Sequence, residues 1–279
     1  MDYWITSDLH YGVAEDGDRA VEALARHVCA HPADALLVGG DIACSVTSLA
    51  RCLALFADFP GAKLAVPGNH DVWLEHEEGD SWALHEQQVP DLFLRAGFHP
   101  LHLEPRTVGE VAFVGSMGWY DYSFRDDIGI ELDWYEKKTL PGGHGPLWND
   151  ARYARFGCSD PELTEQLVTR LAAQLASVPP ALEIVALIHH VATKDLLVHP
   201  RSIVPLRWRF ANAFLGSERF AELLGAAPAV RQIFCGHIHR EKSVLRGAQR
   251  YTSIGGSYRH KQLVRATSRQ IVETRSFTG

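Results

Sequence analysis

The segment Val66-Pro67-Gly68-Asn69-His70-Asp71 follows a short apolar run and places three polar side chains next to one another. Pro67 and Gly68 interrupt a strand, so the sequence predicts a loop that carries these polar residues directly after the strand ends. Open α/β sheets build their binding sites at this carboxyl end of the strands. Asn and Asp also favour turns for local backbone reasons, so the segment alone indicates an ordinary turn and a functional loop about equally.

Four other apolar runs end in Asp or His in the same way. They occupy residues 4–10, 35–41, 184–190 and 233–239, and they end in Asp8 and His10, Asp41, His189 and His190, and His237 and His239. Residues i and i+2 of an extended segment project to the same side. We therefore expect Asp8 to pair with His10 and His237 to pair with His239, each pair binding one ion at a common edge of the sheet.

Strand and helix patterns alternate along the first part of the chain. Residues 2–7, 34–38 and 62–66 are typical of buried strands, and residues 19–30 and 45–59 of amphipathic helices, with Ser45 a candidate N-cap. This alternation predicts parallel strands joined by right-handed crossovers. Further along we expect helices at 80–96, 161–177 and 217–224, and strands at 99–103, 111–115, 183–188, 230–235, 243–245, 250–254, 262–266 and 270–274.

The composition is that of an ordinary globular chain. Its 279 residues are 46% apolar and 22% charged, which suits one α/β domain over residues 1–279. The chain shows neither a secretory leader pattern nor a run of about eighteen apolar residues, so we expect a cytoplasmic protein without a membrane partner. Five cysteines without CxxC spacing argue against a disulfide framework and a thiolate zinc site, and they predict small buried side chains.

Charge is unevenly distributed along the chain. The net charge is −7, but residues 201–279 carry 14 Lys and Arg against 4 Asp and Glu, while residues 1–200 carry 13 against 30. The basic C-terminal region could face an anionic substrate beside an acidic metal-binding body, or it could form a surface on which opposite charges neutralise each other. Because the chain is acidic overall, nucleic acid is an alternative partner but not the favoured one.

Residues 119–160 break the alternation and are typical of an insertion, or cap, within the domain. They contain nine aromatic side chains among many charged ones. Such long segments are usually functional lids or self-packed excursions, so the rings could stack on a base or sugar, or form a small core of the insertion itself. Residues 191–214 are also irregular. Four of their side chains could meet a phosphate or remain at the surface: Arg201, Arg207, Trp208 and Arg209.

The polar residues at the strand ends form one candidate ligand set: Asp8, His10, Asp41, Asn69, His189, His237 and His239. Two carboxylates, one amide and four imidazoles exceed the four ligands of a tetrahedral site and suit two ions. Without thiolates the set favours Mn, Fe or Zn over copper. Two ions about 3.5–4 Å apart can share a bridging hydroxide and neutralise phosphate oxygens, which suits in-line attack on phosphorus.

Five sequence blocks occur in order along the chain: Asp8-x-His10, Gly40-Asp41, Gly68-Asn69-His70-Asp71, His189 and Gly236-His237-x-His239. This pattern, which spans residues 8–239, resembles the calcineurin-like metallophosphoesterases. The resemblance implies an α/β (α+β) fold, a four-layer α/β/β/α sandwich of two mixed sheets, with the site across the strand ends. It also implies a hydrolase that uses two divalent metal ions to cleave a phosphate ester.

The resemblance assigns a role to each ligand residue. One ion would be bound by Asp8, His10 and His239, and the other by Asn69, His189 and His237, while Asp41 would bridge the two.

It also assigns residues to the substrate. His70 would contact the phosphate and protonate the leaving oxygen, a task suited to imidazole near neutral pH. Asn69 is expected at the substrate as well, together with His190, unless that histidine supports a ligand or lies in the core. Asp71 would fix the turn.

The blocks differ from those of one branch of this superfamily. Protein phosphatases are expected to carry an arginine-rich Gly-Asp block and Asn-His-Glu, whereas here Ile42-Ala43-Cys44 follows Asp41 and the third block ends in Asp71. The pattern resembles the cyclic-nucleotide and small phosphodiester branch. We therefore expect hydrolysis of a phosphodiester, ahead of a monoester, of a small organophosphate or nucleotide. A nuclease of the same superfamily and a non-catalytic metal-binding scaffold are the alternatives.

Overall fold

The computed structural model describes residues 1–74, 79–197 and 205–279. Its strands are β1 (Tyr3–Thr6), β2 (Ala35–Gly39), β3 (Ala62–Val66), β4 (Phe98–Pro100), β5 (Arg106–Val108), β6 (Val111–Ser116), β7 (Glu183–Ile188), β8 (Val230–Cys235), β9 (Lys242–Arg246), β10 (Gln249–Ser253), β11 (His260–Ala266) and β12 (Ile271–Thr278). They form two six-stranded sheets, with the orders β12-β11-β1-β2-β3-β4 and β5-β6-β7-β8-β10-β9. Each sheet combines parallel and antiparallel neighbours, so both are mixed.

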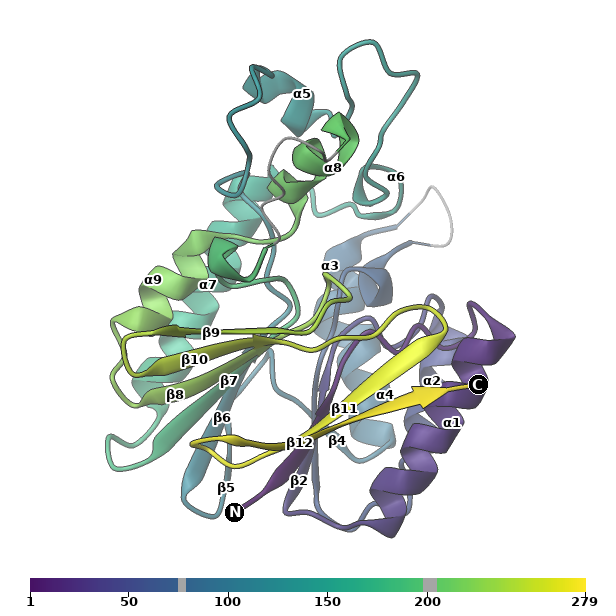
Figure 1. The fold of residues 1–279 in the computed structure, drawn as a ribbon, viewed down its shortest axis with the longest axis vertical. Helices are drawn as coiled ribbons and strands as arrows, with labels where there is room; N and C mark the ends of the chain where they lie inside the picture. The colour runs from purple at the N-terminus through teal and green to yellow at the C-terminus, as the bar shows by residue number, and fades with distance from the viewer. Residues whose placement is uncertain (75–78, 198–204) are drawn as a thin grey trace.

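Helices form the outer layers and the upper part of the molecule. They are α1 (Glu15–Ala30), α2 (Val46–Ala54), α3 (Ser81–Ala83), the π-turn η2 (Leu84–Gln88), α4 (Val89–Arg95), α5 (Leu132–Glu136), α6 (Asp150–Tyr153), α7 (Asp160–Ser177), α8 (Leu206–Ala211) and α9 (Glu218–Gly225), with 3₁₀ turns η1 (His70–Val72), η3 (Lys194–Leu196) and η4 (Asn212–Phe214). Helices α1, α2 and α4 cover the first sheet, and α7 and α9 cover the second (Figure 1). This arrangement confirms the four-layer α/β/β/α sandwich.

The two sheets pack on each other through alternate residues of their strands. In β1, Tyr3 and Ile5 lie between the sheets, whereas Trp4 faces the helices. The Tyr3 ring meets the rings of Phe113 and Phe234 edge-on, at centroid distances of 5.3 and 6.4 Å. Both faces of the central strands are therefore buried, which explains why these strands are continuous apolar runs in the sequence.

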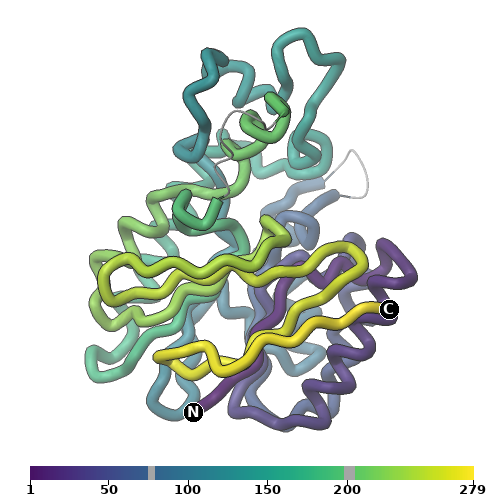
Figure 2. The backbone as a smooth tube through the Cα atoms, viewed as in Figure 1, coloured from purple at the N-terminus to yellow at the C-terminus, as the bar shows by residue number. Residues whose placement is uncertain are grey.

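The strand ends meet in a different way from the one expected. Strands β1, β2 and β3 are parallel neighbours in the first sheet, as predicted, but β7 and β8 belong to the second. The expectation of one common sheet edge is therefore wrong, and the ligand-bearing loops converge from two sheets. The two C-terminal hairpins also separate: β9 and β10 extend the second sheet, whereas β11 and β12 extend the first and return the chain to α1 (Figure 2).

Two predicted helices differ from the observed ones. The helix expected at 45–59 ends at Ala54, although Ser45 caps it by accepting a hydrogen bond from the backbone N–H of Ser48, as predicted. The helix expected at 80–96 contains the π-turn η2 between α3 and α4. Such turns insert one residue into a helix and often occur near functional or strained positions.

Most aromatic rings of residues 119–160 are buried. Trp119, Tyr120 and Tyr135 are at most 1% exposed, and Tyr135 stacks on Phe210 with a centroid distance of 4.5 Å. These rings belong to the main hydrophobic core of the molecule, so the expectation of a small core of the segment itself is wrong. Trp148 is the exception that matters for function, because it is only half-buried and lines a cavity.

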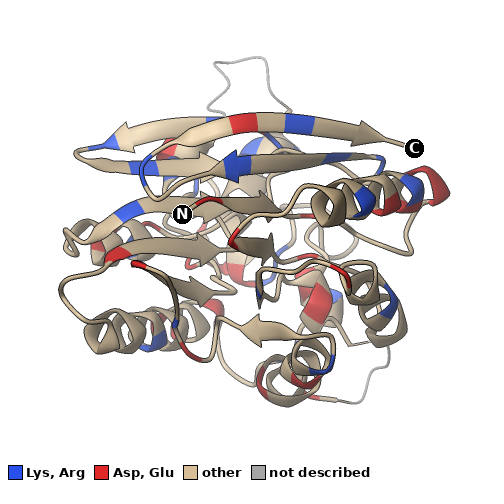
Figure 3. Cartoon of the chain, turned by 90° about the horizontal axis from the view of Figure 1, so that it is seen from below, with Lys and Arg blue, Asp and Glu red and all other residues tan. Residues whose placement is uncertain are grey.

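About half of the described basic residues of the C-terminal region are paired with acidic side chains. Seven of its arginines form ion pairs: Arg209 with Asp126, Arg219 with Glu165, Arg231 and Arg269 with Glu183, Arg246 with Glu218, Arg265 with Asp2, and Arg275 with Glu273. Figure 3 shows blue and red residues interspersed on the lower face of the molecule. The described residues thus favour the mutually neutralised surface. No helix among them is long and apolar enough to span a bilayer.

A buried histidine makes the fold sensitive to acid. Nε2 of His102 donates a hydrogen bond of 2.9 Å to the carbonyl oxygen of His85, and burial holds the pKa of His102 well below its ordinary value. Below about pH 6.5, His102 is therefore protonated in the unfolded chain but stays neutral in the folded chain. The free energy of unfolding falls as the pH falls.

We expect His102→Gln to remove this pH dependence while keeping a side-chain donor. Between about pH 7.5 and about pH 5.5, the wild-type protein should lose roughly 1.4 kcal/mol more stability than the variant. Urea unfolding of both metal-free proteins at the two pH values measures the difference. Equal losses would show that His102 does not contribute.

Candidate metal centre and substrate cavity

The loops after β1, β2 and β8 have an unusual backbone conformation. Asp8, His10, Asp41, His237 and His239 all have positive φ, between 44° and 71°. They do not continue their strands, so the extended geometry assumed for the two i, i+2 pairs is wrong. Asp8 and His10 still fall into one cluster, but His237 and His239 fall into different ones. Left-handed conformations of non-glycine residues are costly and concentrate at functional sites.

The first cluster of candidate metal ligands consists of Asp8, His10, Asp41 and His239. Nε2 of His10 lies 3.0 Å from Nε2 of His239 and 3.7 Å from Oδ2 of Asp41. Oδ1 of Asp8 lies 3.3 Å from Nε2 of His239. Donor atoms from three separate loops therefore converge on one small volume.

The second cluster consists of Asp41, His189 and His237, with Asn69 beside it. Nε2 of His189 lies 3.3 Å from Oδ1 of Asp41, 3.3 Å from Nδ1 of His237 and 3.2 Å from Oδ1 of Asn69. Nδ1 of His189 donates a hydrogen bond of 2.9 Å to the carbonyl oxygen of Gly39. This bond leaves Nε2 of the neutral ring unprotonated and able to bind a cation.

Asp41 is common to both clusters. Its Oδ2 faces His10 and its Oδ1 faces His189. Burial and the nearby carboxylates of Asp8 and Asp71 raise the pKa of Asp41 well above its ordinary value. Divalent cations would relieve this repulsion, so the buried carboxylates and bare imidazole nitrogens fit a metal centre.

The loop that carries Asp41 and the loop after β3 approach each other closely. A Cβ atom on Gly68 would lie 2.2 Å from Oδ1 of Asp41, so only glycine fits there without displacing the ligand. The carboxylate of Asp71 accepts hydrogen bonds from the backbone N–H groups of Gly68, Ile42 and Ala43, at 2.8, 3.0 and 3.1 Å. Asp71 therefore fixes the two loops against each other, which confirms its expected structural role.

His70 lies beside Asp41 and lines the cavity. Its ring stacks on Trp73 with a centroid distance of 3.7 Å, and burial lowers its pKa to about 3, which keeps it neutral. Sγ of Cys44 lies 3.3 Å from Nδ1 of His70. Burial raises the pKa of Cys44 to about 12, so the protonated thiol can donate to Nδ1, an arrangement in which the imidazole proton is on Nε2. Cys44 is thus half-buried against a candidate catalytic residue rather than an inert core side chain.

His10, Cys44 and His70 form a third group that could hold an ion. The two clusters joined by Asp41 bring together more donor atoms than this group, so we take them as the candidate metal positions.

His190 lies behind the candidate metal ligands. It is fully buried, and its Nδ1 donates a hydrogen bond of 3.1 Å to the carbonyl oxygen of Met117. Its ring packs against His237 with a centroid distance of 4.2 Å, and it does not line the cavity. The structure thus places His190 where it can support His237, and not in the substrate position expected for it.

Asp150 is a site residue that no sequence pattern singles out. Its carboxylate accepts hydrogen bonds from Nδ2 of Asn69 at 2.9 Å, Nε1 of Trp73 at 2.7 Å, Nε1 of Trp148 at 2.7 Å and the Tyr120 hydroxyl at 3.1 Å. These bonds turn the amide of Asn69 so that its Oδ1 faces the second cluster. The donors lie far apart in the sequence, so only the folded chain reveals the arrangement.

The loop before β11 and the start of that strand supply two further residues that the sequence did not indicate. Nζ of Lys261 is buried and donates hydrogen bonds to the carbonyl oxygens of Asp8 at 3.2 Å and Ser257 at 2.6 Å. Tyr258 packs over His10 with a ring centroid distance of 4.5 Å and lines the cavity. The first sheet's C-terminal hairpin therefore buttresses the loop after β1.

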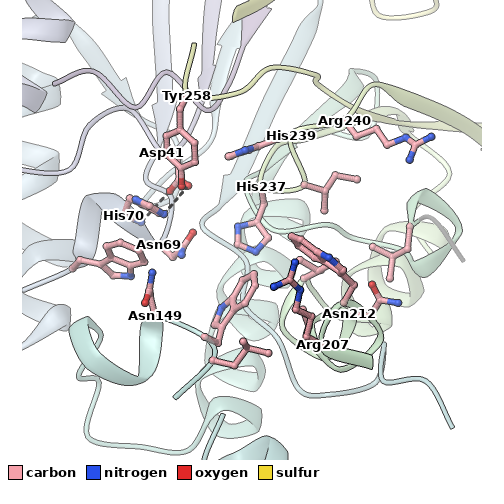
Figure 4. Close-up of a pocket in the computed structure, with 18 of the residues that line it drawn as sticks. Asp41, Asn69, His70, Asn149, Arg207, Asn212, His237, His239, Arg240 and Tyr258 are labelled. Atoms are coloured by element: carbon pink, nitrogen blue, oxygen red, sulfur yellow. Dashed lines mark hydrogen bonds and ion pairs between the residues drawn. The ribbon is translucent and has the colours of Figure 1, made fainter. Parts of the chain in front are cut away.

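A cavity of about 980 Å³ opens on the metal clusters (Figure 4). Asp41, Asn69 and His70 lie at one end of it, and its walls are formed largely by apolar side chains. Among the residues expected to meet a phosphate, Arg207 and Trp208 line this cavity. Arg209 is instead paired with Asp126, and Arg201 lies outside the described residues.

Residues 1–241 match the model of the calcineurin-like phosphoesterase family. The chain belongs to this family. Among solved structures, it is similar to a phosphopantetheinyl hydrolase from Mycobacterium tuberculosis, with 19% identity, a TM-score of 0.70, and 91% of this chain and 89% of that one covered. It is also similar to a dimetal phosphatase from Danio rerio, with 12% identity, a TM-score of 0.55, and coverage of 100% and 98%. At these identities the likeness shows the fold alone. Comparison with curated protein sequences gave no significant match.

Calcineurin-like phosphoesterases are metal-dependent hydrolases of phosphate esters, and this member has the groups of side chains that such chemistry needs. The expected family and enzyme class are therefore confirmed.

The support that Asp150 gives to Asn69 can be tested by Asp150→Asn. The amide introduced at position 150 would direct its N–H group toward side chains that are themselves donors, and it would no longer orient Asn69. We therefore expect the metal affinity or the activity of this calcineurin-like phosphoesterase to fall about 10–100-fold. Calorimetric titration with Mn²⁺ measures the affinity. Asp160→Asn is the matched control, because Asp160 also accepts an indole N–H, from Trp119 at 2.8 Å, but does not contact a candidate ligand. Equal affinity of Asp150→Asn and wild type would contradict the role.

Proposed function

We propose that this calcineurin-like phosphoesterase binds two divalent ions, Mn, Fe or Zn, and hydrolyses a phosphodiester of a small organophosphate or nucleotide. The observation that carries the proposal is the position of Asp41, whose two oxygens face two separate clusters of donor atoms. One ion would be held by Asp8, His10 and His239, and the other by Asn69, His189 and His237, and both would share Asp41.

The ions and the residues around them have different roles in the proposed hydrolysis. When bound, the two ions lower the pKa of water and neutralise charge on the phosphate. The negative charge of a bound phosphate would raise the pKa of His70, so that the ring could take up a second proton and give one from Nε2 to the leaving oxygen, while Cys44 engages Nδ1 and Trp73 fixes the ring plane. Asn69 is held in place by Asp150.

The shape and charge of the site support a small substrate. The cavity of about 980 Å³ has the size of a pocket for a small molecule. The nuclease alternative calls for a continuous basic stripe, whereas most described arginines of the C-terminal region are paired with carboxylates. All five cysteines are free thiols, which agrees with the cytoplasmic location that we propose.

Turnover by metal-stripped protein resupplied with Mn²⁺, Fe²⁺ or Zn²⁺ tests the proposal. We expect bis-p-nitrophenyl phosphate to be hydrolysed faster than p-nitrophenyl phosphate, with no turnover before metal is added. Preference for the monoester would replace the diesterase assignment by a phosphatase. Metal binding without turnover of either ester would favour the non-catalytic scaffold.

A further inference from the structure

Two arginines of the cavity are exceptions to the charge pairing of the C-terminal region. Arg207 and Arg240 line the cavity and are exposed. Neither has a carboxylate partner among the described residues, whereas Arg209, on the same helix as Arg207, is paired with Asp126 at 3.6 Å. An acidic protein with a net charge of −7 thus keeps two unpaired guanidinium groups on the wall of one cavity.

The two arginines are separated from the metal clusters along the cavity. In Figure 4, Asp41 and His70 are drawn on one side of the cavity, and Arg207 and Arg240 on the other. Among the described lining residues, Asp41 is the only one with a carboxylate, and it belongs to the metal clusters. The part of the cavity that carries the two arginines is therefore positively charged and has no carboxylate to balance it. At the other end, the negative charge of Asp41 would be balanced by metal ions.

Apolar side chains also line the cavity, and one of them is fixed in place. They include Leu147, Trp148, Leu197 and Ile238. The indole N–H of Trp148 is held by Asp150 at 2.7 Å, and its ring stacks on Phe214 with a centroid distance of 5.5 Å. A fixed aromatic face of this kind suits the carbon skeleton or planar ring of a ligand.

We propose that the natural ester carries a second anionic group, a phosphate or carboxylate, on its organic portion, and that Arg207 and Arg240 bind this group. The inference rests on the proposed function, because it takes the metal end as the position of the scissile phosphate. Guanidinium groups bind phosphate and carboxylate through paired, charge-assisted hydrogen bonds, so unpaired arginines in a substrate cavity match this chemistry.

Two diesters with the same scissile bond test the proposal. They are the p-nitrophenyl ester of thymidine 5′-phosphate and the same ester with an additional 3′-phosphate, and both release p-nitrophenol. In the wild-type protein the 3′-phosphate should raise kcat/KM about tenfold or more, mainly through KM. Arg207→Gln combined with Arg240→Gln should remove this gain, so that the ratio of the two kcat/KM values falls to about one. Arg209→Gln, the control on the same helix, should keep the gain.

The outcomes separate this inference from the proposed function. Equal turnover of the two esters by the wild-type protein, or a gain that survives in the double variant, would overturn the inference and leave the phosphodiesterase intact. Absence of turnover of both esters and of bis-p-nitrophenyl phosphate would overturn the proposed function. In that case calorimetry with adenosine 3′,5′-bisphosphate and adenosine 5′-monophosphate decides: tighter binding of the bisphosphate that depends on both arginines supports the anion site, and equal binding rejects it.

Discussion

Asp41→Asn is expected to abolish hydrolysis and to leave the protein with fewer than two bound ions. Among the described residues, Asp41 is the one whose oxygens face both clusters, at 3.7 Å from Nε2 of His10 and 3.3 Å from Nε2 of His189. The substitution keeps the shape of the side chain but removes its negative charge, so each ion loses an anionic ligand. We expect kcat/KM to fall by about three orders of magnitude or more, since both ions stabilise the transition state.

Metal content and stability together show why activity is lost. Elemental analysis should find about one ion in Asp8→Asn, because Asp8 belongs to one cluster only, and less than one in Asp41→Asn. Without metal, Asp41→Asn should unfold at the same temperature as wild type or a higher one, because burial and the Asp8 and Asp71 carboxylates disfavour the charge that it removes. Two bound ions and normal turnover in Asp41→Asn would contradict the shared-ligand assignment.

The strands could be predicted from the sequence because the signals for a strand, an apolar run and the residues that end it, lie within the strand and next to it. The runs that became β2, β3, β7 and β8 are apolar on both faces and end in breakers or polar residues, so their positions follow from composition alone. Their distribution between two sheets could not be found in this way. Nothing in an apolar run specifies which neighbour it pairs with, and the four-layer arrangement came from the resemblance to the family.

The ligand set was also predictable, but its geometry was not. The residue types at the strand ends identify Asp41 and His189 as ligand candidates, whereas the assumed i, i+2 pairing of His237 and His239 fails because both residues have positive φ. Backbone conformation at single loop residues depends on close contacts such as Gly68 against Asp41. Those contacts join segments that are distant in the chain.

Supporting residues had no local signal at all. Asp150 lies in an aromatic segment for which the sequence predicts a cap and a self-packed core equally well. Its carboxylate accepts hydrogen bonds from residues 69, 73, 120 and 148. In the sequence, Lys261 is one of many charged residues of the basic C-terminal region. In the fold it is buried and donates a hydrogen bond to the carbonyl oxygen of Asp8. Such residues are defined by what they contact, which only the folded chain shows.

His70→Ala is expected to separate catalysis from metal binding. His70 contributes no atom to the two clusters joined by Asp41, so the variant should retain its ions while kcat falls about 10²–10⁴-fold, the usual contribution of a positioned proton donor. Elemental analysis and steady-state kinetics on the same samples measure both. Cys44→Ala is the control for the third possible ion group, and it should leave metal content unchanged because Cys44 belongs to neither cluster joined by Asp41.

The choice of leaving group shows whether His70 acts as the proton donor. A p-nitrophenolate departs without protonation, whereas an alkyl alkoxide needs a proton in the transition state. The loss in His70→Ala should therefore be small for bis-p-nitrophenyl phosphate and large for a diester whose departing group is an alkyl alcohol. If both esters lose the same factor, His70 acts by contacting the phosphate, and its Nε2 proton does not reach the leaving oxygen. Loss of an ion in His70→Ala would instead show that His70 is a metal ligand. The group formed by His10, Cys44 and His70 would then be one of the metal positions.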